Sequence, residues 1–408
     1  MNTGKIRKDF VVLNRKMDGR PPIYFDNACQ TLRPKQVTDA VREYYDSFPA
    51  CAGRSVHKLA TEVSLRCDET RAKAADFFGA DTPNEIAFTK NTTEGLNTVI
   101  MGMGLKKGDE VVTSDYEHNS VHIPVLRAVE WLGVKHRIIR SLPDGTFDLD
   151  AFEKTMSRKV RLVAICLTSN VTGYTLPAKE VVEIAHANDA QVLFDAAQTA
   201  PSIQLDVGRL GVDFLAASAH KMCGPSGVGF LYCRTGLGDS VRPVMYGGHG
   251  VTDASYDSYE LLPPPERFET GLQNYSGIVG AGAAIDYLSA IGMDEIRSHE
   301  ASLNKAITRG LAGVSGIRPL KPTDPNLRAG IFSFNVDNLS GHDIAMILDN
   351  SKNIMMRSGM HCCHPFFHAR GLDGCARASV YLYNTLEEAK TFVESVEDLA
   401  DKFARSSA

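Results

Sequence analysis

The sequence predicts an α/β protein with a mainly parallel sheet, and two observations carry this prediction. From residue 24 to about residue 232, short apolar runs rich in β-forming residues alternate with longer segments whose apolar residues recur at helical spacing. Several short runs are apolar almost throughout, which is typical of strands covered by helices on both faces. Strands that alternate with helices form a largely parallel sheet, and ligands gather at the carboxyl ends of its strands.

The individual elements follow from these patterns. The expected strands are 110–114, 160–167, 191–195, 213–217 and 229–233. The expected helices between them include one marked by Leu96, Val99, Ile100 and Met103 and one marked by Val181, Val182, Ile184 and Ala185. Asn170, Asp195 and Lys221 then lie close to strand ends, where a ligand is expected.

A second, smaller α+β unit is expected in the last third of the chain. Residues 241–265 are rich in Gly, Tyr, Asp and Pro and indicate a loop, which a helix over 278–291 follows. The later elements are a helix at 301–311, a strand at 331–336, a helix at 342–349, strands at 354–357 and 378–381, and a closing helix at 386–403. We therefore expect a large domain at 23–294 and a small domain made of 1–22 and 295–408.

Length, charge and cysteine content exclude several classes of protein. A chain of 408 residues is long enough for two domains and an enclosed site. A net charge of −5 argues against nucleic acid as the main partner, and no apolar run approaches the roughly 20 residues of a membrane span. The first 14 residues lack the apolar core of a signal peptide, so a cytoplasmic location is expected. The nine scattered cysteines are expected to be reduced.

Lys221 and Asp195 carry the first indication of chemistry. Lys221 follows the apolar run 214–218 and stands beside His220, ahead of two glycines. Such a lysine can lose its proton and form an imine with an aldehyde cofactor. Asp195 ends the run 191–194, where a carboxylate can pair with a pyridinium nitrogen. Together the two predict a site for pyridoxal phosphate (PLP). The alternative is a surface lysine and a turn aspartate at a strand end.

Hydroxyl groups at an expected helix start favour a phosphate site. Residues 91–95 open the helix with Thr92 and Thr93, and free N–H groups at a helix start bind anions well. The alternative is an ordinary threonine N-cap. Ser218 and His220 can reach the same phosphate. His118 can stack on a pyridine ring, although a single histidine is more often a solvated or a core residue.

Further motifs extend along nearly the whole chain. They are Tyr24-Phe-Asp-Asn-Ala28, Arg54-Ser-Val-His57, Thr92-Thr-Glu-Gly95, Glu117-His118, Ser169-Asn170-Val-Thr-Gly173, Asp195-x-x-Gln198, Ser218-x-His-Lys221, Arg267-Phe-Glu-x-Gly271, Arg357-Ser-Gly359, His361-Cys362, Arg377-Ala-Ser379 and Tyr383-Asn-Thr385. The set resembles the class V aminotransferase family of fold-type I PLP enzymes. It is most similar to the Suf-type branch of cysteine desulfurases and selenocysteine lyases, which implies a large domain with a seven-stranded sheet.

The resemblance implies a role for each matching residue. Lys221 would be the Schiff-base lysine, Asp195 the partner of the ring nitrogen, His118 the residue stacked on the ring, and Gln198 the partner of the phenolic oxygen. The phosphate would be held by Thr92, Thr93, Ser218 and His220. The substrate would be bound by Asn170, Arg357 and Arg377. Cys362 would be the nucleophile, with Arg357, His361 and His364 expected to supply positive charge near its thiolate.

The activity implied is that of a PLP-dependent cysteine desulfurase, which converts L-cysteine to L-alanine and leaves a persulfide on Cys362. A homodimer, a sulfur-acceptor protein and a place in iron–sulfur cluster assembly are implied with it. One alternative is a selenocysteine lyase, another Cβ–S lyase or an aminotransferase-like enzyme, in which Cys362 is incidental. A second alternative is a non-catalytic sulfur carrier that uses Cys362 and Cys363 without PLP. The joint presence of Lys221, Asp195, His118 and Gln198 argues against it.

Three positions depart from the family pattern, and one cluster has a second interpretation. Gly53 and Met360 stand where related desulfurases have histidine, which removes polar groups from the mouth of the site. Leu272 replaces a threonine that reaches the phosphate of the partner subunit's cofactor, and leucine has no hydroxyl to donate. Residues 361–364 (His-Cys-Cys-His) also suggest a metal site, but adjacent residues cannot easily all point at one tetrahedral ion, and no metal is expected.

Overall fold

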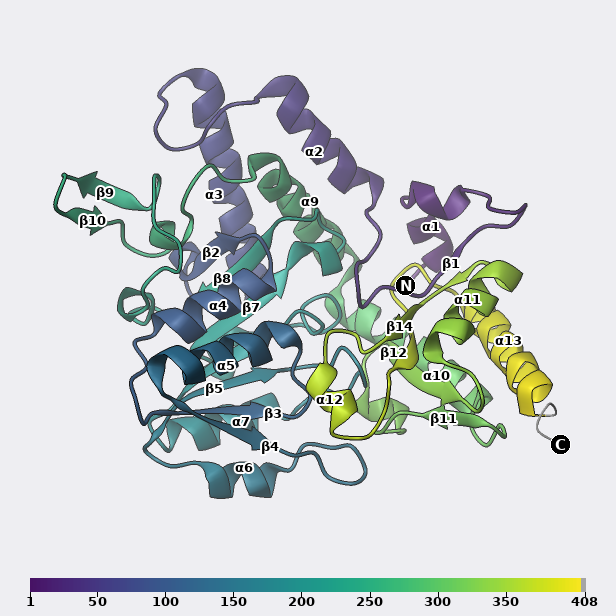
Figure 1. Ribbon diagram of the computed structural model, residues 1–408. Coiled ribbons are helices and arrows are strands. Elements are labelled where there is room, and N and C mark those ends of the chain that lie inside the picture. The colour runs from purple at the N-terminus through teal and green to yellow at the C-terminus, as the bar shows by residue number, and fades with distance from the viewer. Residues whose placement is uncertain (405–408) are drawn as a thin grey trace.

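A seven-stranded sheet forms the centre of the computed structural model, which describes residues 1–404 (Figure 1). Along the chain its strands are β2 (Ile86–Thr89), β3 (Glu110–Ser114), β4 (Lys135–Ile139), β5 (Val160–Cys166), β6 (Gln191–Asp195), β7 (Phe214–Ser218) and β8 (Gly229–Cys233). In space they take the order β2-β8-β7-β6-β5-β3-β4, and β8 runs opposite to the other six strands. The predicted α/β class and mainly parallel sheet are confirmed.

Helices cover both faces of this sheet because its strands are apolar on both sides. One face packs on α4 (Thr92–Gly102) and α5 (Asn119–Leu132), and the other on α3 (Lys58–Phe78), α7 (Ala178–His186) and α9 (Tyr275–Ile291). Val111 contributes to the first apolar layer and its neighbour Val112 to the second, as the alternation of side chains along a strand requires. The remaining helices of this part are α2 (Lys35–Ser47), which packs on α9, α6 (Leu149–Thr155) and α8 (Val207–Leu210).

A four-stranded antiparallel sheet forms the second unit. Its order is β11 (Ile317–Pro319), β12 (Ile331–Val336), β15 (Cys375–Ser379) and β14 (Arg357–Gly359). It packs with α10 (Met293–Gly310), α11 (Gly341–Lys352) and α13 (Leu386–Ala404) around a separate core that contains Phe332, Phe334 and Phe392. Between the two units lies α12 (His364–His368), and α1 (Thr3–Arg7) begins the chain (Figure 1).

Two predicted strands of this unit have different bounds. The strand predicted at 354–357 is divided, since β13 (Ile354–Met355) pairs in parallel with β1 (Ile23–Tyr24) and β14 begins at Arg357. The strand predicted at 378–381 begins three residues earlier, as β15. The predicted division of the chain at residue 294 stays a prediction, and its last four residues, 405–408, lie outside the described part of the chain.

The segment predicted as a loop at 241–265 contains a hairpin. Its strands β9 (Val251–Ala254) and β10 (Tyr259–Leu261) project from one end of the molecule, at the left of Figure 1. Among residues 1–404, no single helix has both the length and the apolar composition to cross a membrane. The pair α9 and α10 meets these criteria only when taken together, with a bend of 75° between them.

Candidate active site

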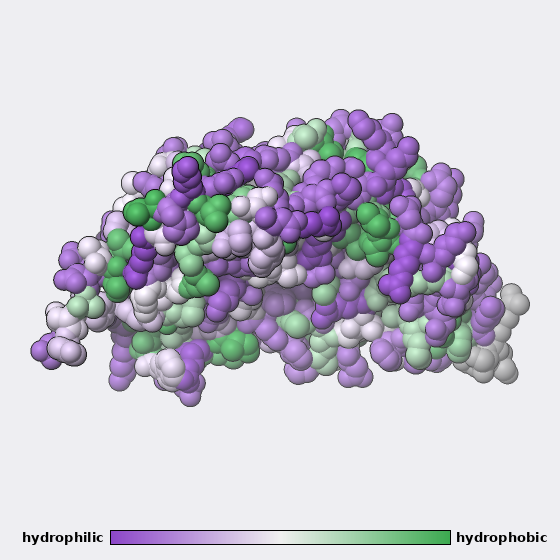
Figure 2. Space-filling view, turned by 90° about the horizontal axis from the view of Figure 1, so that it is seen from above, coloured by the Kyte–Doolittle hydropathy of each residue, from purple (hydrophilic) through white to green (hydrophobic). Residues whose placement is uncertain are grey.

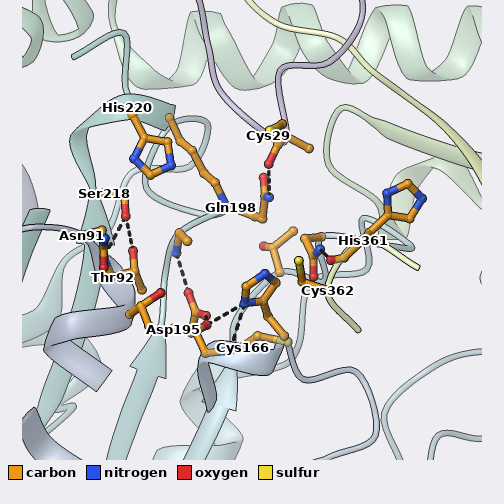
Figure 3. Close-up of a pocket in the computed structure, with 18 of the residues that line it drawn as sticks. Cys29, Asn91, Thr92, Cys166, Asp195, Gln198, Ser218, His220, His361 and Cys362 are labelled. Carbon is orange, nitrogen blue, oxygen red and sulfur yellow. Dashed lines mark hydrogen bonds between the residues drawn. The ribbon is translucent and has the colours of Figure 1, made fainter. Parts of the chain in front are cut away.

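All the site residues predicted from the sequence line one cavity of about 210 Å³. They are Thr92, Thr93, His118, Asn170, Asp195, Gln198, Ser218, His220, Lys221, Arg357, Cys362 and Arg377. The cavity lies at the carboxyl ends of β6 and β7, and the second unit closes it through β14, β15 and the segment before α12. In Figure 3, Asn91, Thr92, Ser218 and His220 lie on one side of the cavity and His361 and Cys362 on the other, with Cys29 next to Gln198.

Lys221 and Asp195 stand at neighbouring strand ends. Asp195 is the last residue of β6, and Lys221 ends the short 3-10 helix η3 (Ala219–Lys221) directly after β7. Burial raises the pKa of Asp195, which the N–H of Ala197 at 2.9 Å and the charge of Lys221 partly oppose. Burial lowers the pKa of Lys221, which Asp195 partly opposes. The pair therefore offers an amine that loses its proton readily and a carboxylate that lacks a full cationic partner.

The start of α4 forms the phosphate end of the cavity. Asn91 caps the helix by accepting the N–H of Glu94 at 3.1 Å. Ser218 accepts the N–H of Thr92 at 2.8 Å, and its hydroxyl lies 2.6 Å from that of Thr92. Burial, followed by the charge of Lys221, lowers the pKa of His220 to about 4, so its neutral ring can donate a hydrogen bond. The hydroxyl groups, the N–H groups and the helix start at this end of the cavity therefore form a donor set that can bind an oxyanion.

Close packing fixes this end of the site. A Cβ atom on Gly229 would lie 2.7 Å from the Cα of Asn91 and 2.8 Å from the carbonyl oxygen of Ala217. Only glycine therefore permits the first turn of α4 to approach β8 this closely. The helix start and its hydroxyl groups are consequently held by the backbone of the sheet.

His118 is linked to Asp195 through Ser120. Its Nδ1 accepts the N–H of Ser120 at 3.1 Å and lies 2.8 Å from the Ser120 hydroxyl, which in turn lies 3.4 Å from Asp195 Oδ2. Burial, followed by the charge of Lys221, lowers the pKa of His118 to about 4, which leaves a neutral ring. Sequence reasoning missed Ser120, although its position two residues after His118 in an N-cap pattern was a usable signal. Gln198 donates its Nε2 to the carbonyl of Ala28 at 2.7 Å.

Cys362 lies exposed on a strained loop. His361 and Cys362 both have left-handed backbone angles, with φ of 48° and 57°, which cost non-glycine residues about 1–2 kcal/mol each. Two hydrogen bonds hold the loop: Asn119 N–H donates to the Cys362 carbonyl at 2.7 Å, and Asn170 Nδ2 donates to the His361 carbonyl at 2.9 Å. The cysteine is therefore presented by a short, tethered turn.

The positive charge that was expected near the Cys362 thiolate is not supplied by His361. Burial, followed by the charges of Arg377 and Arg357, lowers the pKa of His361 to about 2, so His361 is neutral and supplies no positive charge. Arg357 Nη1 contacts the sulfur of Cys29, at 2.6 Å. Cys29 also lines the cavity and was missed from the sequence, because its partner lies 328 residues away.

Arg377 is the buried cation of the cavity. It is 2% exposed, donates to the carbonyl of Asn170 at 2.8 Å, and reaches Asp26 at 3.3 Å. Its Nε is buried without a hydrogen-bond partner, and so is Nδ1 of His361. Because an unpaired buried donor is costly, these atoms point to a polar or anionic ligand at this end of the cavity.

The donor set fits the cofactor that the resemblance implies. Phosphate donors stand at one end, Asp195 can face a ring nitrogen, His118 can cover the ring, and Lys221 supplies the amine. The raised pKa of Asp195 reflects a buried carboxylate without a strong cation, and a protonated ring nitrogen would supply that cation. The residues present therefore match PLP in charge and in hydrogen bonding.

The three departures from the family pattern lie outside the cavity lining. Gly53 belongs to an exposed segment and has a φ of 86°, and Met360 precedes the tethered turn, where its carbonyl accepts the N–H of Cys363 at 2.8 Å. Leu272 is 77% exposed. Within residues 1–404, no group of three or more His, Cys, Asp or Glu side chains is arranged to hold a metal ion.

Comparisons with known proteins agree with this geometry. The family model described as Aminotransferase class-V matches residues 23–392. A probable cysteine desulfurase of Pyrococcus abyssi is 40% identical over 388 residues, which cover 94% of this chain and 96% of the relative. The apo structure of a cysteine desulfurase from Thermococcus onnurineus NA1 is 40% identical, with a TM-score of 0.93 and 98% of each chain covered. The cysteine desulfurase CsdA of Escherichia coli is 28% identical, with a TM-score of 0.90 and 99% of each chain covered.

Proposed function

The chain belongs to the class V aminotransferase family, and on that premise we propose that it is a PLP-dependent cysteine desulfurase. The proposed reaction converts L-cysteine to L-alanine and leaves the sulfur as a persulfide on Cys362. One observation carries the proposal: Lys221, Asp195 and Cys362 line the same cavity. A substrate bound in this cavity would therefore meet an amine, a carboxylate and a nucleophilic sulfur. A β-elimination lyase needs the first two groups but has no use for the third.

Proton transfer at the substrate Cα is assigned to Lys221. PLP, when bound, supplies an electron sink beside that carbon. The lowered pKa of Lys221 makes its amine a more available base, and the same amine returns the proton later. Asp195 would hold the ring nitrogen protonated, and the neutral His118 would cover the ring without adding a competing charge.

Substrate orientation is assigned to Arg377 and Asn170. Arg377 has a free, buried Nε and a guanidinium that can bind a carboxylate through two parallel hydrogen bonds. Asn170 lies beside it, because its carbonyl accepts Nη1 of Arg377. Cys362 lines the same cavity as this carboxylate site, so a substrate bound there shares the cavity with the nucleophile.

Sulfur abstraction is assigned to Cys362. Its thiolate attacks the substrate sulfur, the Cβ–S bond breaks, and the electron pair of that bond stays with the substrate carbon. After two protons have been added to the carbon skeleton the product is alanine, and the sulfane sulfur is bound to Cys362. The exposure of Cys362 then lets an acceptor reach this sulfur from outside.

A homodimer, a sulfur-acceptor protein and a cytoplasmic role in iron–sulfur cluster assembly complete the proposal. Support for the dimer comes from apolar side chains exposed on two neighbouring segments, among them Val56, Leu59, Leu65 and Leu272. The face seen from above carries separate hydrophobic patches on a mostly hydrophilic surface (Figure 2). Light scattering should give the mass of a dimer, and Val56→Asp combined with Leu272→Asp should shift it to that of a monomer.

The product ratio tests the proposed activity. PLP-loaded protein with L-cysteine and a thiol reductant should release alanine and sulfide in equal amounts. Cys362→Ala should stop sulfide release, whereas Cys51→Ala, which removes another exposed thiol, should not. Pyruvate and ammonia in place of alanine would identify a β-elimination lyase and leave Cys362 without its role. The same assay with selenocysteine distinguishes a selenocysteine lyase.

A further inference from the structure

A second accessible thiol, that of Cys29, lies in the same cavity as Cys362. Cys29 follows β1 on the segment that closes the cavity, and its N–H donates to the carbonyl of Asp26 at 3.1 Å. It is half-buried, and its sulfur contacts Nη1 of Arg357. Cys29 lies beside Gln198 and Cys362 beside His361, and both line the cavity (Figure 3).

The other cysteines near this cavity are unsuited to exchange sulfur. Cys363 is fully buried and donates its S–H to Asn170 Oδ1 at 3.0 Å, and burial raises its pKa far above the usual range. Cys166 is buried as well, and burial raises its pKa in the same way. Both thiols therefore stay protonated and are poor nucleophiles. Cys29 is the remaining partner for Cys362 among the cysteines that line the cavity.

The surroundings of Cys29 carry positive charge. Arg357 contacts its sulfur, and Lys221 and Arg377 line the same cavity. The buried, unpartnered Nε of Arg377, which is assigned above to the substrate carboxylate, shows that the cavity receives an anionic group. Arginine beside a sulfur stabilises the negative charge that develops when the sulfur enters or leaves a disulfide-type bond.

We propose that Cys29 is a second sulfur carrier that takes the sulfane sulfur from the persulfide of Cys362, an inference that rests on the proposed function. The Cys29 thiolate attacks the outer sulfur of the Cys362 persulfide. A bond from the Cys29 sulfur to the outer sulfur forms, the bond from the Cys362 sulfur breaks, and Cys362 leaves as a thiolate. The hydrogen on the outer sulfur travels with it, so that no oxidant or reductant is consumed.

This transfer frees Cys362 for a second turnover before an acceptor arrives. Arg357 contacts the Cys29 sulfur before the transfer and stays beside the same sulfur when it carries the persulfide. Each subunit then stores more than one sulfane sulfur. The carried sulfur is also held inside the cavity, where the half-buried Cys29 protects it from solvent better than the exposed Cys362 does.

Peptide mass spectrometry tests the transfer. PLP-loaded protein is treated with L-cysteine without reductant or acceptor, alkylated, and digested with trypsin. Cys29 and Cys362 fall on different tryptic peptides because Lys and Arg residues separate them. We expect persulfide on both peptides in the wild type, on the Cys362 peptide alone in Cys29→Ser, and on neither in Cys362→Ser. Cys51→Ser, which removes an exposed thiol outside the cavity, should behave as the wild type does.

The remaining outcomes separate this inference from the proposed function. Absence of persulfide from Cys362 in the wild type would refute the desulfurase activity itself. Persulfide on Cys362 but not on Cys29 would leave that activity standing and overturn the transfer. Persulfide on Cys29 in the Cys362→Ser variant would show direct attack on the substrate, which also overturns a transfer from Cys362. Persulfide on Cys51 equal to that on Cys29 would mean unselective exchange among exposed thiols.

Discussion

The side-chain oxygen of Asn170 accepts a hydrogen bond from the thiol of Cys363 at 3.0 Å. The other end of the same carboxamide donates to the carbonyl of His361 at 2.9 Å, so Asn170 holds the residues on both sides of Cys362. Asn170 is also a proposed ligand of the substrate carboxylate. Substrate that engages Asn170 must therefore compete with the tethers of the nucleophile loop, and occupancy of the cavity and mobility of Cys362 are linked.

Replacement of Asn170 tests this link. Asn170→Ala removes both tethers, and we expect faster alkylation of Cys363, together with a KM for L-cysteine raised about 10-fold, since each lost hydrogen bond is worth about 1 kcal/mol. The alkylation rate is measured by mass spectrometry. Asn188→Ala, which removes an amide bonded to the carbonyl of Ile184 at 3.0 Å, is the matched control. Unchanged protection of Cys363 in Asn170→Ala would contradict the link.

Removal of Lys221 should abolish turnover without loss of the fold. Lys221→Ala deletes a buried amine whose pKa burial lowers, so the free energy of unfolding should stay equal or rise. Alanine formation should fall at least about 100-fold, the usual contribution of a general base. Lys179→Ala, which removes a lysine of an exposed ion pair with Glu183, should leave both quantities unchanged. Turnover that survives in Lys221→Ala would overturn the assignment.

Arg377 should contribute chiefly to substrate binding. Arg377→Lys retains the charge but loses the planar fork that binds a carboxylate through two bonds, so KM for L-cysteine should rise about 10–100-fold while kcat changes less. Steady-state kinetics separate the two parameters. Arg318→Lys, at an exposed pair with Asp337, serves as control. A fall in kcat with KM unchanged would instead place Arg377 in the chemical step.

The stability of the fold is expected to depend on pH through Glu300, a buried carboxyl that does not line the catalytic cavity. Burial raises its pKa to about 8, with hydrogen bonds from Ser202 and from the backbone of Gly330 in partial opposition. Because the folded pKa exceeds the unfolded value of about 4.5, the stability due to this carboxyl is complete below pH 4.5 and is lost as the pH rises through 8.

Glu300→Gln removes the titration and keeps an oxygen for the Ser202 hydroxyl. The unfolding free energy of the variant minus that of the wild type should increase by about 2–3 kcal/mol from pH 5 to pH 8. Urea unfolding at the two pH values measures this difference. Equal unfolding free energies of variant and wild type at both pH values would show that Glu300 ionises in the folded protein as it does in water.

The sequence predicts the parts of the site that depend on local pattern. Asp195 and Lys221 were predicted because each follows an apolar strand, and the cavity does lie at the ends of β6 and β7. Strand β4 was missed because it lies at the edge of the sheet and is largely exposed. Its sequence begins with Lys-His-Arg, so three polar residues precede its first apolar residue. Edge strands lack the double-sided apolar signal on which the prediction rests.

The contacts that were missed join distant segments. Arg357 reaches Cys29 across 328 residues, and the Ser120 hydroxyl reaches Asp195 across 75. No periodicity records such a pairing, because it depends on how segments distant in the sequence pack together. The charge expected on His361 was wrong for a related reason: burial, which the sequence does not reveal, keeps its ring neutral.

The parallel pairing of β1 with β13 has a consequence for synthesis on the ribosome. Ile23 pairs with Ile354, so the strand emerges about 330 residues before its partner. At typical elongation rates that interval lasts roughly 15–65 seconds, during which the central sheet can form while the segment that carries Cys29 still lacks its anchor. The catalytic cavity is thus assembled only when translation is nearly complete, and a nascent chain that stalls before residue 354 would display a finished sheet without a closed site.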